Sequence, residues 1–249
     1  MRILICFLLF CLVGTLVCEY SEKKHEKEKG RRVKRFAITL LLGTALTTGA
    51  SLIGTTVTGL KSSSYRVSVS GSVENYSKWT LKLQTCEIKS GYMNTPLRTI
   101  VPGYREGFAS HKTSNTATGS YVRCTFDPLN GDLIHIMYSA PYSFDFHANW
   151  LGFAICPKSS SECRSITADK MYYEKTSYAK LKKFARSISQ LRTCGTHFCM
   201  TGTMGTSHKP ELDIRVYPTD YERLSTAVKK SSAKNRWSKG DYETFVNSM

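Results

Sequence analysis

Apolar and polar side chains alternate through much of the chain between residues 65 and 217, and this two-residue period most constrains the fold. The stretches that show it, or that read as strands between turns, are 65–70, 78–83, 121–126, 133–139, 150–156 and 212–217. A period of two is typical of strands that bury one face. The sequence therefore predicts an all-β sandwich or barrel over residues 62–218, long enough to build its own core.

Glycine-containing dipeptides separate several of these strand candidates. They are Ser90-Gly91, Pro102-Gly103, Asn130-Gly131 and Thr201-Gly202. Glycine reaches the backbone conformations that tight turns need, so each dipeptide is expected to mark a turn. The glycosylation sequon that begins at Asn75 would mark a further surface turn if it is used.

Three stretches break the alternation. Residues 167–178 predict a short helix whose first turn Thr167 caps. Residues 178–191 place apolar side chains near helical spacing, with basic side chains between them, and predict another helix. Residues 219–249 are polar and charged, so we expect a mobile tail there that opens with a helical turn.

The N-terminus reads as an export signal followed by a propeptide. Residues 1–18 combine Arg2, an apolar run and a small residue, Cys18, which is the pattern of a secretory signal peptide. The alternative is a membrane anchor, but the apolar run here is shorter than the roughly 18 residues that a membrane span needs. Residues 19–35 are highly charged and end in the R-x-K-R pattern that furin-like proteases cut. We interpret them as a propeptide; the alternative is a solvated charge run.

Residues 36–60 contain 25 positions without a charge. A helix of about 20 apolar residues spans a bilayer, so this segment is long enough to insert. Its recurring glycines would allow close approach of neighbouring helices. We predict a membrane-inserting helix over 36–61, with an ordinary core helix and an uncleaved signal anchor as the alternatives.

Six cysteines lie beyond residue 35, and an even number in an exported chain predicts disulfides, with 15 possible pairings. The pairs Cys156–Cys163 and Cys194–Cys199 would close short loops and leave Cys86 with Cys124. The tract that contains His197 between Cys194 and Cys199 also resembles half of a zinc site. A second half with that spacing is missing, so no metal is expected.

The net charge of the chain is +16, and residues 1–35 contribute five of these positive charges. The remaining surface is therefore still strongly basic and attracts anionic partners. For an exported protein, membranes or glycans are more suitable partners than nucleic acid.

An aromatic-rich stretch, residues 137–150, is too polar to be one buried strand. Burial in the core is the alternative, but aromatic rings on an exposed loop suit a membrane interface, and their faces can hold a choline-type cation. The side chains that we expect to contact the membrane are Tyr142, Phe144 and, on the predicted short helix, Tyr173.

Five motifs in this order resemble the actinoporins, the pore-forming toxins of sea anemones, and their relatives in molluscs. The most specific is SAPYSFDFHANW at 139–150. The others are KSG at 89–91, ATGSY at 117–121, ADKMYYE at 168–174 and ELDIRVYP at 211–218. The resemblance implies a β-sandwich with an N-terminal apolar helix and a second short helix. It also implies a pocket for a lipid headgroup.

The resemblance assigns the headgroup pocket to eight positions: Ser90, Tyr121, Ser139, Pro141, Phe146, His147, Trp150 and Tyr172. Three of them depart from the family pattern. Tyr121 stands where a small aliphatic residue is usual, Phe146 where a Trp is usual and His147 where a Tyr is usual.

These features predict a secreted pore-forming toxin. It would bind a lipid membrane through the aromatic loop and the basic surface, form a homo-oligomer and insert its N-terminal helix into the target cell membrane. The alternative is a non-lytic lectin-like module that binds lipid or glycan on the same sandwich. A hydrolase is third, because the histidines show no spacing to a nucleophile and G-x-S-x-G is absent. No enzymatic activity and no cofactor are expected.

Overall fold

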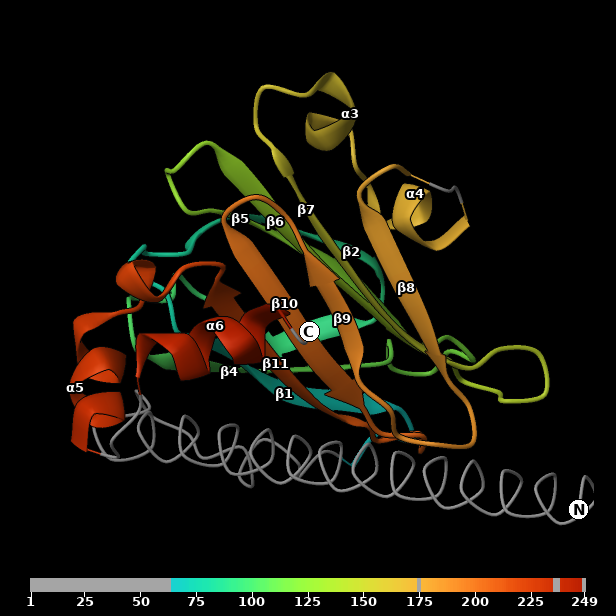
Figure 1. Cartoon of the computed structure of the whole chain (residues 1–249). Coiled ribbons are helices and arrows are strands. Elements are labelled where there is room, and N and C mark those ends of the chain that lie inside the picture. The colour runs from blue at the N-terminus through green and yellow to red at the C-terminus, as the bar shows by residue number, and fades with distance from the viewer. Residues whose placement is uncertain (1–63, 174–175, 235–237, 248–249) are drawn as a thin grey trace, which may run out of the picture. The chain divides into compact units, whose positions relative to one another are not determined.

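The computed structural model describes residues 64–173, 176–234 and 238–247. Eleven strands form two sheets: six in the order β3-β4-β1-β11-β10-β9, and five in the order β2-β5-β6-β7-β8 (Figure 1). The all-β sandwich that the sequence predicts is therefore confirmed. The predicted signal peptide (1–18), propeptide (19–35) and apolar helix (36–61) lie outside the described residues.

The strands and helices have the following boundaries. The six-stranded sheet contains β1 (Ser68–Asn75), β3 (Tyr92–Thr95), β4 (Arg105–His111), β9 (Leu191–Cys194), β10 (Phe198–Met204) and β11 (Glu211–Pro218). The five-stranded sheet contains β2 (Lys82–Ser90), β5 (Ser120–Asp127), β6 (Asp132–Ala140), β7 (Asn149–Pro157) and β8 (Ala179–Phe184). The helices are α3 (Ser161–Arg164), α4 (Ala168–Tyr173), the 3-10 turn η1 (Tyr221–Arg223), α5 (Thr226–Lys234) and α6 (Lys239–Asn247).

Strand β1 occupies the middle of the six-stranded sheet. It pairs with β4 in the antiparallel sense and with β11 in the parallel sense, with Ser70 opposite Glu211 and Asn75 opposite Val216. All other strand pairs are antiparallel. The first and last strands of the sandwich are thus hydrogen-bonded to each other, which ties the two ends of the domain together.

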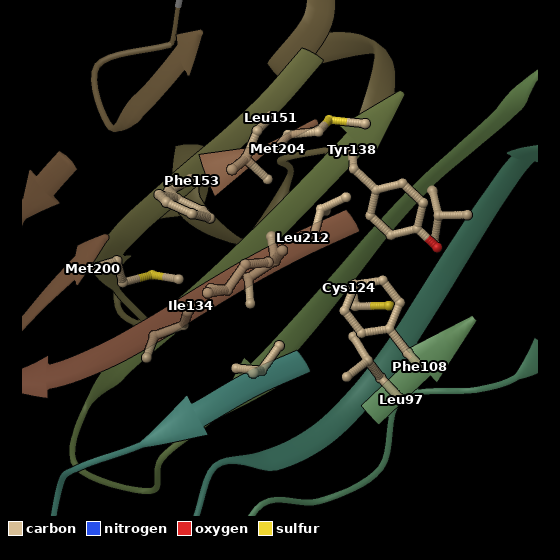
Figure 2. Close-up of a cluster of buried hydrophobic side chains, with 14 of the residues drawn as sticks. Leu97, Phe108, Cys124, Ile134, Tyr138, Leu151, Phe153, Met200, Met204 and Leu212 are labelled. Carbon is tan, nitrogen blue, oxygen red and sulfur yellow. The ribbon is translucent and has the colours of Figure 1, made fainter. Parts of the chain in front are cut away.

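The inner faces of the two sheets meet in one hydrophobic core. Figure 2 shows side chains from both sheets, among them Phe108 and Leu212 from one and Phe153 from the other, all at most 1% exposed. Tyr138 is also buried, and its hydroxyl donates to Ser110 Oγ at 2.9 Å. The polar group of this core tyrosine is therefore satisfied, as buried polar groups must be.

Three disulfides have the pairing expected from the loop lengths. Cys86 bonds to Cys124 and Cys194 to Cys199, and in both pairs the cysteines lie directly opposite each other on neighbouring strands. The third, Cys156–Cys163, links the end of β7 to α3. Each bond fastens a peripheral piece of the sandwich: the edge strand β2, the β9–β10 turn or the short helix.

Three of the four predicted glycine turns are present, and the fourth prediction is wrong. Gly91, Gly103 and Gly131 have positive φ angles of 89°, 77° and 96°, which glycine adopts readily. Gly202 instead lies within β10 and faces the core. A Cβ atom there would stand 2.5 Å from Cζ of Phe153 on the opposite sheet. Glycine is needed at this position for close sheet packing rather than for a turn.

The predicted helix over 178–191 is wrong. Residues Ala179–Phe184 form strand β8, which pairs with the edge of β7. In this strand Leu181 packs on the outer face of the sheet while Phe184 enters the core. Pairing with β7 satisfies the backbone, and this long-range interaction overrides the helical spacing of the apolar residues. The other predicted short helix is present as α4, and Thr167 Oγ1 accepts the Lys170 amide at 3.1 Å.

The expected mobile tail is also wrong, because residues beyond Pro218 fold onto the sandwich. Tyr242 of α6 is fully buried and donates its hydroxyl to the Pro218 carbonyl at 2.7 Å. Phe245 packs edge-on against Tyr217, with ring centroids 5.4 Å apart. Few apolar residues in a polar sequence are thus enough to dock the helix. In the described part of the chain, no helix combines the length and apolarity needed to cross a bilayer.

The sequon at Asn75 does not mark a surface turn. Asn75 is fully buried, and its amide donates to the carbonyls of Trp79 and Ile100 at 2.7 and 3.1 Å. Its Oδ1 accepts from the amide and hydroxyl of Ser77. A glycan cannot be attached there in the folded protein, because every polar atom of this side chain holds the loop that follows β1.

Replacing Gly202 by Ala should lower the free energy of unfolding by about 1–3 kcal/mol, because the added Cβ atom must displace Phe153 in a well-packed core. Urea unfolding followed by tryptophan fluorescence measures this change. Gly240→Ala is the matched control, since its Cβ atom would meet nothing closer than 3.8 Å. Equal stability of both variants would contradict the close packing inferred at Gly202.

Candidate lipid-binding site

Four of the predicted headgroup residues form one row across the five-stranded sheet. Ser90 of β2 lies opposite Tyr121 of β5, Tyr121 opposite Ser139 of β6, and Ser139 opposite Trp150 of β7. Residues directly opposite in antiparallel strands point to the same face. Since the next residue of β7, Leu151, enters the core, this row lies on the outer face of the sheet. Register alone brings these four side chains together.

Helix α4 adds the aromatic wall above this row. The ring centroid of Tyr172 lies 5.6 Å from that of Tyr121 and 5.7 Å from that of Trp150. Tyr173, 72% exposed, packs edge-on against Tyr172 at 4.6 Å. These distances are typical of attractive aromatic pairs. The result is a cluster of four rings from three elements, partly open to solvent.

The hydroxyl of Tyr121 is buried and has no hydrogen-bond partner among the residues that the structure describes. Burial raises the pKa of Tyr121 far above its usual value, and the neighbouring carboxylate of Asp169 acts in the same direction. The hydroxyl therefore keeps its proton. A buried, unpartnered donor costs free energy unless a ligand or water accepts from it, so this group is suited to hold a polar ligand atom.

Pro141 and Ser90 fix the strand ends beside the row. Pro141 is buried, and a Cβ atom on Gly119 would lie 2.1 Å from the carbonyl oxygen of Ala140. Ser90 Oγ donates to the carbonyl of Gly119 at 3.0 Å. The chain therefore needs glycine at 119 so that the loop before β5 can approach the end of β6. Ser90 and Pro141 have a clear structural role at the site.

The loop after β6 presents its aromatic residues unevenly. Phe146 is 83% exposed, and the neighbouring His147 is exposed too. Phe144, 40% exposed, stacks on His208 with centroids 4.2 Å apart. No ring contact joins Phe146 or His147 to the four-ring cluster within residues 64–173 and 176–234. These two predicted pocket residues thus lie on the same end of the sandwich but outside the cluster.

Tyr142, predicted to contact the membrane, is half-buried instead of standing at the loop tip. Its ring packs against the core, and the Arg66 guanidinium lies 4.6 Å from the ring centroid. The Lys112 ammonium lies 5.8 Å from the same ring. A tyrosine stacked with two cations holds the base of the loop in place.

A carboxylate holds α4 over the sheet. Glu87 Oε2 accepts the backbone N–H of Ala168, at the start of α4, at 2.9 Å and Nε of Arg123 at 3.0 Å. Partial burial raises the pKa of Glu87, but these hydrogen bonds outweigh it and hold the pKa below its usual value. The carboxylate is therefore ionised at neutral pH and fixes the helix that carries Tyr172.

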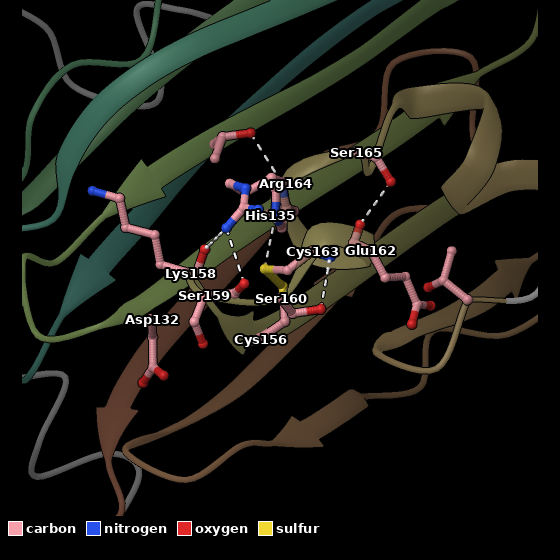
Figure 3. The surroundings of a disulfide bond; sticks show 12 residues. Asp132, His135, Cys156, Lys158, Ser159, Ser160, Glu162, Cys163, Arg164 and Ser165 are labelled. Carbon is pink, nitrogen blue, oxygen red and sulfur yellow. Dashed lines mark hydrogen bonds between the residues drawn. A yellow bond between two sulfur atoms is a disulfide. The ribbon is translucent and has the colours of Figure 1, made fainter.

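The network continues beneath the helix to the Cys156–Cys163 disulfide (Figure 3). Arg123 contacts Thr125 and lies 3.2 Å from Nδ1 of His135, whose Nε2 is 4.0 Å from Cys163 Sγ. His135 is 2% exposed. Burial first, and the Arg123 charge second, lower the pKa of His135 to about 3. This histidine is neutral at physiological pH, and its role is to pack between Arg123 and the disulfide.

The cysteine and histidine groups of the described chain do not offer a free metal site. His135 has two sulfur atoms near it, but Cys156 and Cys163 are bonded to each other. The tract around His197 that resembles half of a zinc site is likewise closed by the Cys194–Cys199 disulfide, and His197 contacts Asp132 at 2.8 Å. Neither pair supplies the thiolates that zinc needs.

Sequence reasoning missed two basic residues around the site. Lys183 of β8 lies directly opposite Trp150 and extends the row on the same outer face. Arg66 covers Tyr142. The alternation of Ala179, Leu181 and Lys183 indicates a strand in which Lys183 shares a face with Leu181. This was not recognised because the segment was predicted to be a helix. Arg66 could have been identified from its position in the alternating segment 65–70, which leads into β1.

Comparison with known proteins relates the chain to mollusc toxins. Tereporin-Ca1 from Terebra anilis is 31% identical over 184 residues, which cover 70% of this chain and 96% of that protein. Echotoxin-2 from Monoplex parthenopeus is 30% identical over 196 residues, covering 75% of this chain and 70% of that protein. No family model matches the chain.

The comparison with solved structures supports the fold. The lipid binding protein Nakanori superposes with a TM-score of 0.50 at 12% identity, over 60% of this chain and 70% of that chain. At this identity the likeness concerns the fold alone. It agrees with the two-sheet architecture described above.

The buried state of His135 makes stability depend on pH. The unfolded chain binds a proton on this histidine near pH 6.5, whereas the folded chain does so only near pH 3. Stability is therefore fully present above pH 6.5 and falls by up to ~1.4 kcal/mol per pH unit as the pH drops through this window.

His135→Gln should flatten this dependence by about 1 kcal/mol per pH unit, because the amide does not titrate. Urea unfolding between pH 7 and pH 4 gives the slopes. His147→Gln, at an exposed histidine, should keep the slope of the unmodified protein. Equal slopes for His135→Gln and the unmodified protein would show that this histidine accepts its proton in the folded state.

Proposed function

The chain belongs to the actinoporin-like toxins of molluscs, and from this premise we propose that it is a secreted protein that permeabilises target membranes. It binds lipid through the four-ring cluster and the loop after β6, assembles with further copies of itself and inserts its N-terminal segment. Its relatives are toxins rather than enzymes, and the protein is not an enzyme.

The single observation that carries the proposal is the cross-strand row beneath Tyr172. Trp150 and Tyr172 pack edge-to-face with ring centroids 5.7 Å apart, and an aromatic face left open beside such a pair attracts quaternary ammonium groups. Lys183 lies opposite Trp150 on the same face, where its ammonium can pair with a phosphate. A phosphocholine-type headgroup has both charges. The predicted pocket residues Ser90, Tyr121 and Ser139 add hydroxyls to this face.

Exposed apolar side chains beside the row support attachment to a bilayer. Phe146 is 83% exposed and Phe144 is 40% exposed, both on the loop after β6. Aromatic residues are enriched at the interface between water and lipid. An exposed ring is therefore stabilised when the loop enters the headgroup region, while the two-sheet scaffold stays outside.

The pore itself is assigned to residues 36–60. In lipid every backbone group must be satisfied, so a helix or a closed barrel must form the wall. This uncharged segment of 25 residues reaches ~37 Å as a helix, more than the ~30 Å hydrocarbon core. Several copies would have to assemble to enclose a pore. The charged residues 19–35 have to be removed first, because charges are costly to move into a bilayer.

Phe146→Ala should weaken binding to phosphatidylcholine vesicles about tenfold, since a buried phenyl ring contributes roughly 1.5–3 kcal/mol. Folding should be unaffected, because the ring is 83% exposed and pairs with no other aromatic ring among the described residues. Leu129→Ala, at a residue 71% exposed on the β5–β6 turn, is the matched control and should bind normally. Sedimentation with vesicles gives the affinities. Unchanged binding by Phe146→Ala would argue against the loop as the attachment site.

Binding and permeabilisation should be separable. A chain that starts at Lys61 should bind vesicles but release no enclosed dye, because it lacks the inserting segment. A chain that begins at residue 36 should do both, and one that keeps residues 19–35 should lyse poorly. Dye release and sedimentation on the same vesicles give both readouts. Lysis by the Lys61 chain equal to that of the longer chain would overturn the assigned role of residues 36–60.

A further inference from the structure

The edge of the sandwich where β8 and β9 meet has a strongly one-sided charge. Residues 176–194 contain five basic residues and no acidic residue. These residues are Lys180, Lys182, Lys183, Arg186 and Arg192. Strands β8 and β9 are the edge strands of the two different sheets, and the chain passes directly from one to the other (Figure 1). The fold therefore gathers these charges along one edge.

Most of these charges are not neutralised. Within residues 64–173, 176–234 and 238–247, no acidic side chain forms an ion pair with Lys180, Lys183 or Arg186, and all three are exposed. Lys182 donates to the Gln190 carbonyl at 3.2 Å, which satisfies the ammonium without cancelling its charge. The edge thus keeps its positive potential.

The opposite edge of the same sheet provides the contrast. On β2, Lys89 pairs with Asp169 at 2.5 Å, and the neighbouring Arg123 pairs with Glu87 at 3.0 Å. The positive charges of Lys89 and Arg123 are therefore balanced by carboxylates. Lysines on an edge strand commonly prevent unwanted strand pairing, but that purpose does not require an edge free of acidic residues.

The basic edge is continuous with the proposed lipid site. Lys183 lies directly opposite Trp150, and the β8–β9 connection begins two residues later, after Phe184. Lys180 is three residues further along the strand, about 10 Å away. This distance is close to the Debye length of about 8–10 Å at physiological salt. Lys180 lies opposite the core residue Phe153 and so leaves the strand on the other face from Lys183, which means that the two cations flank the edge and their fields overlap at a membrane that meets this edge.

The connection itself carries an apolar tip. Ile188 is 64% exposed and lies between Arg186 and Arg192 in the sequence. A single exposed apolar residue needs no explanation in isolation. Flanked by cations in the sequence, it matches the pattern of a segment that lies in the headgroup layer, with basic groups toward anionic lipid and an apolar group inward.

We propose that the β8–β9 edge is a second membrane-contact surface, which binds anionic phospholipid of the phosphatidylserine class. It deepens the proposed function, on which it rests, because the aromatic cluster brings this edge to the bilayer. The aromatic site takes a zwitterionic headgroup, and the edge adds affinity in proportion to the anionic lipid in the same leaflet.

The test compares vesicles of phosphatidylcholine alone with vesicles that also contain phosphatidylserine. Each cation near an anionic surface contributes up to about a fivefold gain in binding. The unmodified protein should therefore bind the mixed vesicles at least about tenfold more tightly, and added salt should remove this gain. The triple variant K180Q/K182Q/R186Q, which keeps Lys183 beside Trp150, should lose most of the gain and keep its affinity for phosphatidylcholine alone.

A matched control removes three exposed lysines elsewhere: K78Q/K82Q/K230Q. Lys82 begins β2 opposite Asp127, at the other end of the sandwich, and Lys230 lies on α5. This control should keep the gain, and thermal unfolding should show both variants folded. If both triple variants lose the same share of the gain from phosphatidylserine, the gain depends on the net charge of the protein rather than on this edge, and the proposal is overturned.

Other outcomes separate the two proposals. Binding to phosphatidylcholine with no gain from phosphatidylserine refutes the edge surface alone. Binding only to the mixed vesicles, lost in K180Q/K182Q/R186Q, supports the edge and refutes the zwitterionic site. Binding to neither refutes both. If the triple variant loses retention on heparin but keeps the lipid gain, the edge binds a sulfated glycan and the lipid assignment is wrong.

Discussion

The register of β5, β6 and β7 is the constraint on which the site depends. Tyr121, Ser139 and Trp150 are separated by long stretches of sequence, yet direct cross-strand pairing places them on one face. A slip of one residue would move each of these side chains to the opposite face, into the core. The apolar residues that alternate with them, such as Leu151 and Val122, prevent this slip because they must stay buried. Core packing and site geometry are thus specified by the same strands.

Residues beneath the site hold helix α4 in position. Helix α4 is short, and a helix of this length is marginal without tertiary contacts. Glu87 joins its first backbone N–H to Arg123 of the sheet, and Met171 packs on the outer face of β6 and β7. The buried His135 and the Cys156–Cys163 disulfide fill the layer next to it. The orientation of Tyr172 therefore rests on groups that touch no ligand.

Much of the fold followed from local patterns, and the failures have a common cause. Strand β11 alternates clearly, β6 was predicted as a strand between turns, and the site residue Ser139 on β6 was found through a motif at fixed spacing. Strand β8, the docking of α6 and the strand role of Gly202 depend on partners far along the chain: Gly152, Tyr217 and Phe153. Lys183 was missed for the same reason, because its place beside Trp150 exists only after β8 pairs with β7. Long-range pairing cannot be read from spacing within one segment.

The central position of β1 has a mechanical consequence. This strand is hydrogen-bonded on both sides over most of its length, to β4 and to β11. It begins at Ser68, at the same end of the sandwich as His111, His208 and the loop after β6. A pull on the chain that enters β1 would load both ladders in shear, so the hydrogen bonds share the load instead of opening one after another. The sandwich can thus act as a fixed anchor against a force that is applied through the chain before β1.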